Sequence, residues 1–198
     1  MDYQRSVLIR RAPLPQFVAE FRDTERIGKF CCQCPNYARS WACPPLSEDM
    51  SARPGSYTYV TLVASCYTPN SPGMLIADFR QTIMPEIQRL EHRMRAIEPQ
   101  CDGYTFGNID GCRLCPEVCR RPDGLACAHP DLVRPSLEAY GFDVTSAVNR
   151  LFGIEMRWST DGFVPEYLVF VNGLFHNRPF DTDLLTARCV SRNIVCSQ

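Results

Sequence analysis

The sequence contains no run of about twenty apolar residues, so we expect no helix that spans a membrane. Its opening stretch, MDYQRSVLIRRAPLP, lacks the long apolar core and the small-residue cleavage site of a secretory signal. The net charge of −1 provides no general attraction for nucleic acid or for an acidic membrane surface. We therefore expect a cytoplasmic protein that has no membrane span and no nucleic-acid partner.

Familiar catalytic motifs are missing as well. The sequence has no H-E-x-x-H motif, no glycine-rich phosphate loop and no Ser/His/Asp order typical of a hydrolase. Of the three histidines, we expect His92 on a helix surface and His176 in a turn. His129 is expected in a loop, where it forms hydrogen bonds near a metal centre, with ligation of the metal as the alternative. These patterns assign no catalytic residue, and whether the protein is an enzyme stays open.

Cysteine, in contrast, is abundant, with 12 in 198 residues. Without a secretory signal, so many thiols indicate a reducing compartment, where cysteines bind metals or react rather than forming a disulfide scaffold. Most of them fall in two segments, FCCQCPNYARSWACPP at 30–45 and GCRLCPEVCRRPDGLACAHP at 111–130. Because prolines interrupt regular structure in both segments, we expect both to be metal-binding loops.

The second segment has the spacing C-x2-C-x3-C-x7-C, formed by Cys112, Cys115, Cys119 and Cys127. Four thiolates can hold either a tetrahedral zinc ion or an iron–sulfur cluster. Zinc sites usually consist of two short cysteine pairs separated by a longer loop. Here three cysteines form one compact run and the fourth follows, so the spacing favours iron–sulfur over zinc, with zinc as the alternative.

The first segment offers Cys31, Cys32, Cys34 and Cys43. Adjacent cysteines rarely bind the same centre, so one of Cys31 and Cys32 is expected to be surplus. A 4Fe–4S cluster with four cysteine ligands is closed and favours electron transfer, whereas three ligands leave one iron open to a substrate or solvent. The sequence leaves open which of the two cysteines binds, and whether the chain holds one cluster or two.

Hydrophobic patterns predict the α+β class, with α/β as the alternative. Strands are predicted over 6–10, 56–67, 102–109 and 166–175, and helical segments over 13–23, 71–99, 134–141 and 143–153. We expect one sheet with packed helices and with both cysteine segments on loops. The whole chain, 1–198, is expected to be one metal-binding domain, or two small lobes that share a core.

The longest predicted helix has a clear apolar face and one proline within it. Apolar residues recur at steps of three and four, which places them on one side of a helix: Ile76, Phe79, Ile83, Ile87, Leu90, Met94 and Ile97. Pro85 removes a backbone hydrogen bond in this run, so we expect either a kink or two abutting helices.

Several phrases together resemble an uncharacterised bacterial and archaeal cysteine-rich family of predicted metal-binding proteins. They are CPNYARSWACPP, GCRLCPEVC, DGLACAHP and RPSLEAYGFDV, and they cover roughly a quarter of the chain. The resemblance implies metal or iron–sulfur binding but no particular reaction. The ligands it implies are Cys34, Cys43, Cys112, Cys115, Cys119 and Cys127, with Cys31 or Cys32 as the upstream member. Ala38 stands where the family usually has glycine.

Residues around the two segments carry secondary expectations. Tyr37 and Trp41 would shield a cluster from water, and Arg134 could place a positive charge near it. Leu137 and Tyr140 are expected to pack the RPSLEAYG phrase onto the core. Four other cysteines lie outside the two segments. Cys66 is expected to be a buried thiol in a strand, and Cys101 a reserve ligand. Cys189 and Cys196 are expected to be thiols of the C-terminal tail, without a neighbouring base.

The leading hypothesis is an iron–sulfur protein with one or two 4Fe–4S clusters that transfers electrons or activates a partner redox enzyme. A redox partner protein is expected in that case. The first alternative is an enzyme that uses an open iron for sulfur or small-molecule chemistry. The second is an interaction module stabilised by zinc, in which metal binding supplies folding energy.

Overall fold

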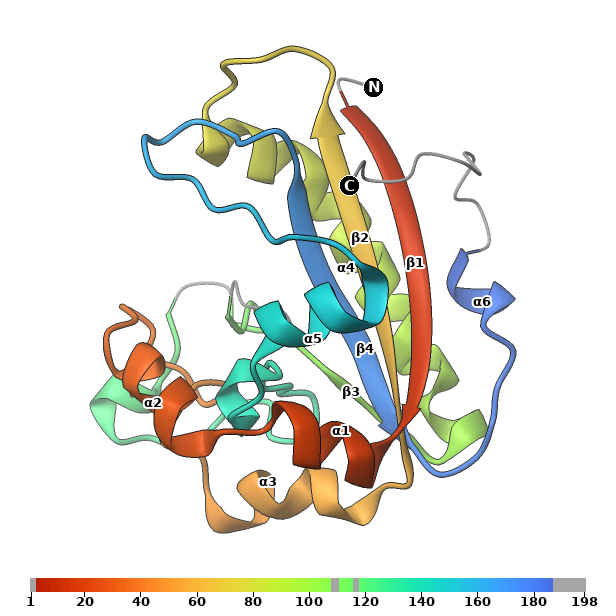
Figure 1. Ribbon diagram of the computed structural model, residues 1–198. Helices are drawn as coiled ribbons and strands as arrows, with labels where there is room; N and C mark the ends of the chain where they lie inside the picture. The colour runs from red at the N-terminus through yellow and green to blue at the C-terminus, as the bar shows by residue number, and fades with distance from the viewer. Residues whose placement is uncertain (1–2, 108–110, 116–117, 187–198) are drawn as a thin grey trace.

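A computed structural model describes residues 3–107, 111–115 and 118–186, and its centre is one sheet (Figure 1). The sheet has four strands in the order β1-β2-β4-β3, and every neighbouring pair is antiparallel. The strands are β1 (Tyr3–Pro13), β2 (Tyr59–Pro69), β3 (Gly103–Phe106) and β4 (Leu168–His176). An α/β fold requires parallel strands, so the antiparallel sheet confirms the α+β class.

Helix α4 (Ile76–Cys101) covers one face of the sheet, behind the strands in Figure 1. The predicted apolar face is buried from Phe79 to Ile97, and Ile76 at its start is partly buried. The helix continues through Pro85, so the prediction of two abutting helices is wrong. Pro85 removes one backbone hydrogen bond, but the apolar residues before and after it remain packed on the same sheet.

The other face of the sheet carries short helices from three parts of the chain. Helix α1 (Leu14–Phe21), the 3-10 turn η3 (Glu138–Tyr140) and α5 (Val144–Phe152) pack there against β2 and Phe175. Side chains of β2 alternate between the faces: Val60, Leu62, Ala64 and Cys66 join this core, whereas Val63 and Tyr67 face α4. The expectation of a buried Cys66 in a strand is thereby confirmed.

The RPSLEAYG phrase packs onto the core through Leu137 and Tyr140, each 2% exposed, as predicted. Gly141 ends this turn with a φ of +85°, a conformation that strains residues with a Cβ. A Cβ there would also lie 2.6 Å from the methyl group of Thr24. Gly141 therefore brings η3 into close contact with α2 (Thr24–Cys32), the helix that leads into the first cysteine segment.

Short segments complete the architecture. Helix α3 (Glu48–Ala52) and the 3-10 helix η1 (Arg53–Ser56) precede β2, η2 (Arg121–Asp123) lies in the second cysteine segment, and α6 (Asp183–Thr186) follows β4. The predicted caps of α5 are confirmed, because Asp143 accepts a hydrogen bond from the Ser146 amide at 3.0 Å and Gly153 ends the helix. Within the described ranges, no helix is both long and apolar enough to cross a bilayer.

His176 is not in a turn, as the sequence suggested, but is the last residue of β4 and fully buried. Its Nδ1 lies 2.9 Å from the Arg178 carbonyl oxygen, and its Nε2 lies 2.9 Å from the Thr61 hydroxyl. Because a carbonyl can only accept, Nδ1 carries the proton and Nε2 accepts from Thr61. The expected surface position of His92, in contrast, is confirmed.

We expect His176 to make the fold sensitive to mild acid. Burial lowers the pKa of His176 below its ordinary value, so the unfolded chain binds a proton more readily than the folded chain. The stability that the neutral His176 contributes is complete above the pKa that this histidine has in the unfolded chain. It is lost as the pH falls toward the lower pKa that His176 has in the folded protein. Urea unfolding at pH 7.5 and 5.5 should show a smaller loss of stability in His176→Asn than in wild type. His92→Gln is the matched control, and an equal loss in all three proteins would contradict the prediction.

Candidate metal centre

The first cysteine segment begins inside a helix, so the prediction of a loop over 30–45 is wrong at its start. Cys31 and Cys32 form the last turn of α2. Asp23 caps this helix by accepting from the Arg26 amide at 2.9 Å, and Lys29 pairs with Glu25 at 2.9 Å. The helix ends just before the Cys-Pro step, where the residue preceding proline disfavours helical geometry. The rest of the segment is a series of turns.

The two adjacent cysteines lie on different sides of α2, since successive helical residues are about 100° apart. Cys31 is partly buried and lines a cavity together with Cys34 and Cys43. Cys32 is exposed, does not line that cavity, and its thiol forms a hydrogen bond that raises the pKa of the Tyr37 hydroxyl. The structure therefore places Cys31, rather than Cys32, on the same wall as the other two thiols.

The Cys31 thiol lies beside η3. Its Sγ donates a hydrogen bond to the Glu138 carbonyl oxygen at 3.8 Å. Burial, together with the nearby Glu138 carboxyl and the neighbouring thiols, raises the pKa of Cys31 to about 11. Burial also raises the pKa of Cys43. Metal binding at this wall must therefore displace protons from the thiols.

The four cysteines of the second segment are all partly buried. Burial is the main cause that raises the pKa of Cys112, and Cys127, Cys119 and Cys115 raise it further through their charges. The backbone amide of His129 donates to the Cys127 Sγ at 3.4 Å. The sequence predicts these four cysteines as one ligand set, and the structure brings them near one another.

Arg121 joins the two cysteine segments, which lie side by side at the lower left of Figure 1. Its guanidinium donates to three carbonyl oxygens of the first segment, Ser40 at 2.7 Å, Cys43 at 2.5 Å and Pro45 at 2.6 Å. It also stacks on Trp41, with its Cζ 4.9 Å from the ring centroid. Cys112 of the second segment also raises the pKa of Cys43 slightly through its charge.

Trp41 strengthens the same contact, because its Nε1 donates to the Leu125 carbonyl at 3.1 Å. Sequence reasoning placed Trp41 beside the first segment but did not identify Arg121. The carbonyls that Arg121 binds are about eighty residues away in the chain. Such carbonyls are present in every sequence and leave no residue-specific signal.

The cavity beside the first segment has a volume of about 600 Å³. Its lining residues include Cys31, Cys34 and Cys43, together with residues of η3, the start of α5 and Trp158. Glu138 lines this cavity, and burial raises the pKa of its carboxyl group despite hydrogen bonds from its own backbone amide and Ser136. At the mouth, Arg26 forms an ion pair with Asp143. The cavity therefore joins soft sulfur ligands to an apolar, pocket-like space.

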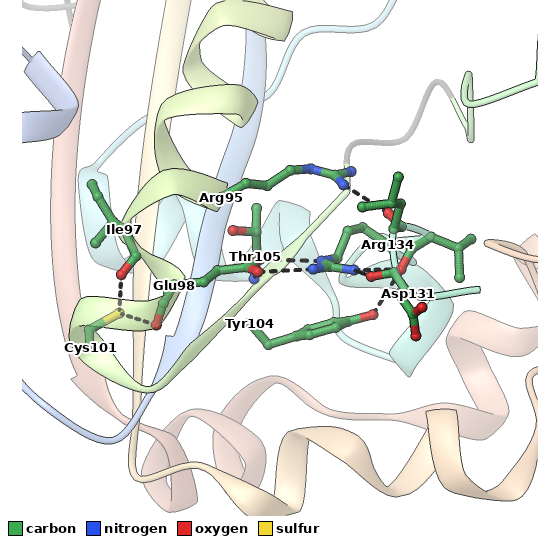
Figure 2. Close-up of polar contacts among 10 residues, drawn as sticks. Arg95, Ile97, Glu98, Cys101, Tyr104, Thr105, Asp131 and Arg134 are labelled. Atoms are coloured by element: carbon green, nitrogen blue, oxygen red, sulfur yellow. Dashed lines mark hydrogen bonds and ion pairs between the residues drawn. The ribbon is translucent and has the colours of Figure 1, made fainter. Parts of the chain in front are cut away.

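Arg134, whose role the sequence left open, forms its ion pair with a residue of α4. Figure 2 shows its guanidinium pointing to Glu98 of α4, with the pair at 2.9 Å and the Arg134 side chain 9% exposed. Its Cζ also lies 4.3 Å from the centroid of the Tyr104 ring. Arg134 therefore fixes the segment before η3 to α4 and β3.

Cys101, the reserve ligand, also lies elsewhere. It is fully buried at the end of α4, where its thiol donates to the Ile97 carbonyl at 3.4 Å (Figure 2). It does not line the cavity. Cys189 and Cys196 lie outside the described residues. No disulfide joins the cysteines of the part of the chain that the structure describes.

The donor set fits a metal centre by its chemistry, because thiolates prefer zinc and iron–sulfur clusters over hard cations. Among residues 3–107, 111–115 and 118–186, no three cysteine, histidine or carboxylate side chains converge closely enough to form a ready-made metal site. Cys31, Cys34 and Cys43 nevertheless line the same cavity, and the charges of Cys34 and Cys43 raise the pKa of Cys31. Binding would draw together thiols that are already neighbours.

The backbone of Ala38, between Cys34 and Cys43, has a φ of +56°, and its amide donates to the Pro44 carbonyl at 2.8 Å. An alanine in this left-handed conformation is strained by roughly 1–2 kcal/mol, whereas glycine is not. The glycine expected here from the family resemblance therefore has a physical reason.

We expect Ala38→Gly to raise the free energy of unfolding by about 0.5–1 kcal/mol, because the relieved strain exceeds the added entropy of the unfolded chain. Urea unfolding of the purified protein measures this change. Ala52→Gly is the control, since Ala52 has a φ of −78° and needs no glycine. Equal destabilisation by both substitutions would contradict the account of Ala38.

Residues 18–171 match the family described as "Predicted metal-binding protein (DUF2284)". The match spans both cysteine segments and all the residues that line the cavity. A search of curated proteins and a search of solved structures each found no match to the chain.

Proposed function

Because the chain belongs to this family of predicted metal-binding proteins, we propose that it is an iron–sulfur protein that carries two 4Fe–4S clusters and transfers electrons. The observation that supports this proposal is the arrangement of the thiols. The charges of Cys115, Cys119 and Cys127 act on Cys112, and Cys31, Cys34 and Cys43 line one cavity. When bound, such clusters accept and release single electrons.

In this proposal, Cys112, Cys115, Cys119 and Cys127 hold a closed cluster. Four thiolates satisfy all four irons, which favours electron transfer over binding of a substrate. The backbone amide of His129 donates to one of these sulfurs and would help to set the reduction potential. A redox partner protein would deliver electrons to this cluster or accept them from it.

Cys31, Cys34 and Cys43 would hold the second cluster, and Cys32 is surplus. The contact made by Arg121 places Cys43 near the Cys112 group, which suits electron movement between the two centres. Three thiolates leave one iron without a cysteine. Because the same three cysteines line the cavity, a second candidate function is an enzyme that binds a small molecule at that iron.

Electron paramagnetic resonance of protein purified without oxygen and reduced with dithionite tests both candidates. We expect two signals, of which only one changes when cyanide is added, because only one cluster has an open iron. Two signals that are both indifferent to cyanide would support electron transfer alone. A protein that contains zinc and gives no iron signal would instead support the zinc-stabilised interaction module.

A further inference from the structure

We propose that Arg121, although it belongs to the second cysteine segment, is a positioning residue for the metal centre of the first segment. Its guanidinium holds the turn that carries Cys43 where this thiol can serve as a ligand. The inference rests on the proposed function for the presence of a metal centre at Cys31, Cys34 and Cys43. It is carried by the contacts of Arg121, by the hydrogen bonds of the turn, and by the separate origins of the three thiols.

The Arg121 guanidinium binds the backbone on both sides of Cys43. One terminal nitrogen, Nη1, donates to the carbonyl oxygens of Ser40 and Cys43, and the other, Nη2, donates to that of Pro45. Because the donors of a guanidinium form a rigid planar fork, these bonds fix the orientation of the turn as well as its position. The stack on the Trp41 ring holds the fork from a further side. In the described ranges, every hydrogen bond of the Arg121 side chain goes to the first segment.

Two hydrogen bonds shape the turn from within. The Cys43 amide donates to the Ser40 carbonyl at 3.0 Å, and the Ala42 amide donates to the Ser40 hydroxyl at 3.2 Å. Both bonds lie within residues 40–43, so they set the shape of the turn but not its position relative to the other thiols. That position depends on contacts from outside. Arg121 supplies three of them from η2, which lies 76 to 81 residues further along the chain.

Position matters because the three thiols come from different elements. Cys31 is held in the last turn of α2 and Cys34 follows directly, whereas Cys43 comes from the turn nine residues later. In the part of the chain that the structure describes, no ready-made metal site exists, so binding must draw these thiols together. Groups that orient a metal ligand without touching the metal typically contribute 10- to 100-fold to its affinity. Loss of Arg121 would free Cys43 alone and weaken this centre.

The test compares how fast each centre loses its metal. Cys112→Ser should keep only the first centre and Cys31→Ser only the second, so Arg121→Gln is added to each of these two variants. The full chains are purified without oxygen and exposed to EDTA, and the released metal is measured over time. We expect Arg121→Gln to speed release at least about tenfold in the Cys112→Ser protein, and less than about twofold in the Cys31→Ser protein.

Arg120→Gln is the matched control, because it changes the same side chain at the exposed neighbouring position and should leave both rates unchanged. Arg121→Lys separates position from charge. A lysine keeps the charge but lacks the planar fork, so release from the first centre should stay fast. Circular dichroism establishes folding. Trp41→Phe, which loses the hydrogen bond to Leu125, is a second variant that should speed release in the same direction by a smaller factor.

Three results would overturn the proposal: unchanged release from the first centre of folded Arg121→Gln protein, equal acceleration at both centres, or full rescue by Arg121→Lys. Iron and zinc are measured on every sample, so that the two proposals can fail separately. Faster release of zinc from the first centre would refute the iron–sulfur assignment alone. Bound iron with unchanged release would refute the role of Arg121 alone, and a protein that binds neither metal would refute both.

Discussion

Replacing Cys112 with serine is expected to remove about half of the bound iron and sulfide and a matching share of the absorption near 400 nm. Cys112 is one of the four proposed ligands of this cluster, so the substitution replaces the thiolate of one iron with a serine hydroxyl. A hydroxyl is a hard donor that stays protonated at neutral pH, and it does not replace a thiolate on iron. Iron and sulfide analysis with an absorption spectrum measures the effect.

Cys66→Ser is the matched control for this substitution. Cys66 is buried in β2, within the core and outside both cysteine segments, so the variant should keep its iron while losing some stability. If Cys112→Ser kept the iron content and spectrum of wild type, the second segment would hold no cluster.

The second large effect is expected from the adjacent pair Cys31 and Cys32. Cys31→Ser should abolish the paramagnetic signal that responds to cyanide and remove about half of the iron, because it changes a thiol on the cavity wall. Cys32→Ser should keep both, because Cys32 is exposed on another side of α2. Each variant serves as the control for the other, since they make the same chemical change at neighbouring positions.

The opposite result, loss of the signal in Cys32→Ser and its retention in Cys31→Ser, would contradict the orientation of α2 and the ligand set drawn from it. Equal loss in both variants would mean that both cysteines support the cluster. The contrast therefore tests a feature that spacing along the chain leaves undecided.

Much of the fold could be predicted from local patterns. The β-branched and aromatic run of β2 is a strong signal for a buried strand, and the three-to-four spacing along α4 is strong because this helix buries one face against the sheet. The caps Asp143 and Gly153 were also predictable, since a capping carboxylate and a left-handed glycine act within one turn of the helix.

Other features depend on contacts that are distant in the sequence. His176 looked like a turn residue because it follows an apolar run, but it pairs with Thr61 across the sheet. Helix α2 extends to Cys32 because Asp23 caps it and Gly141 lets η3 pack close to its start. The proline-rich composition of the segment concealed this helix.

The candidate ligands could be named from cysteine spacing, but their surroundings could not. Arg121 donates to the carbonyl of Cys43, which is 78 residues away in the chain. Cys31 forms its hydrogen bond with Glu138, which is 107 residues away. Neither contact has a sequence motif of its own. The cavity that Cys31 lines and Cys32 does not is built from segments that are far apart in the chain, so the spacing of the cysteines could not reveal it.

The central claim is that the two cysteine segments bind iron–sulfur clusters, and it is tested most directly by analysing wild-type protein purified without oxygen. Absorption, iron, sulfide and zinc should be measured on the same sample. We predict a brown protein that absorbs near 400 nm, with about eight irons and about eight sulfides per chain. A colourless protein with stoichiometric zinc and no sulfide would contradict the claim and make the chain a zinc-stabilised module.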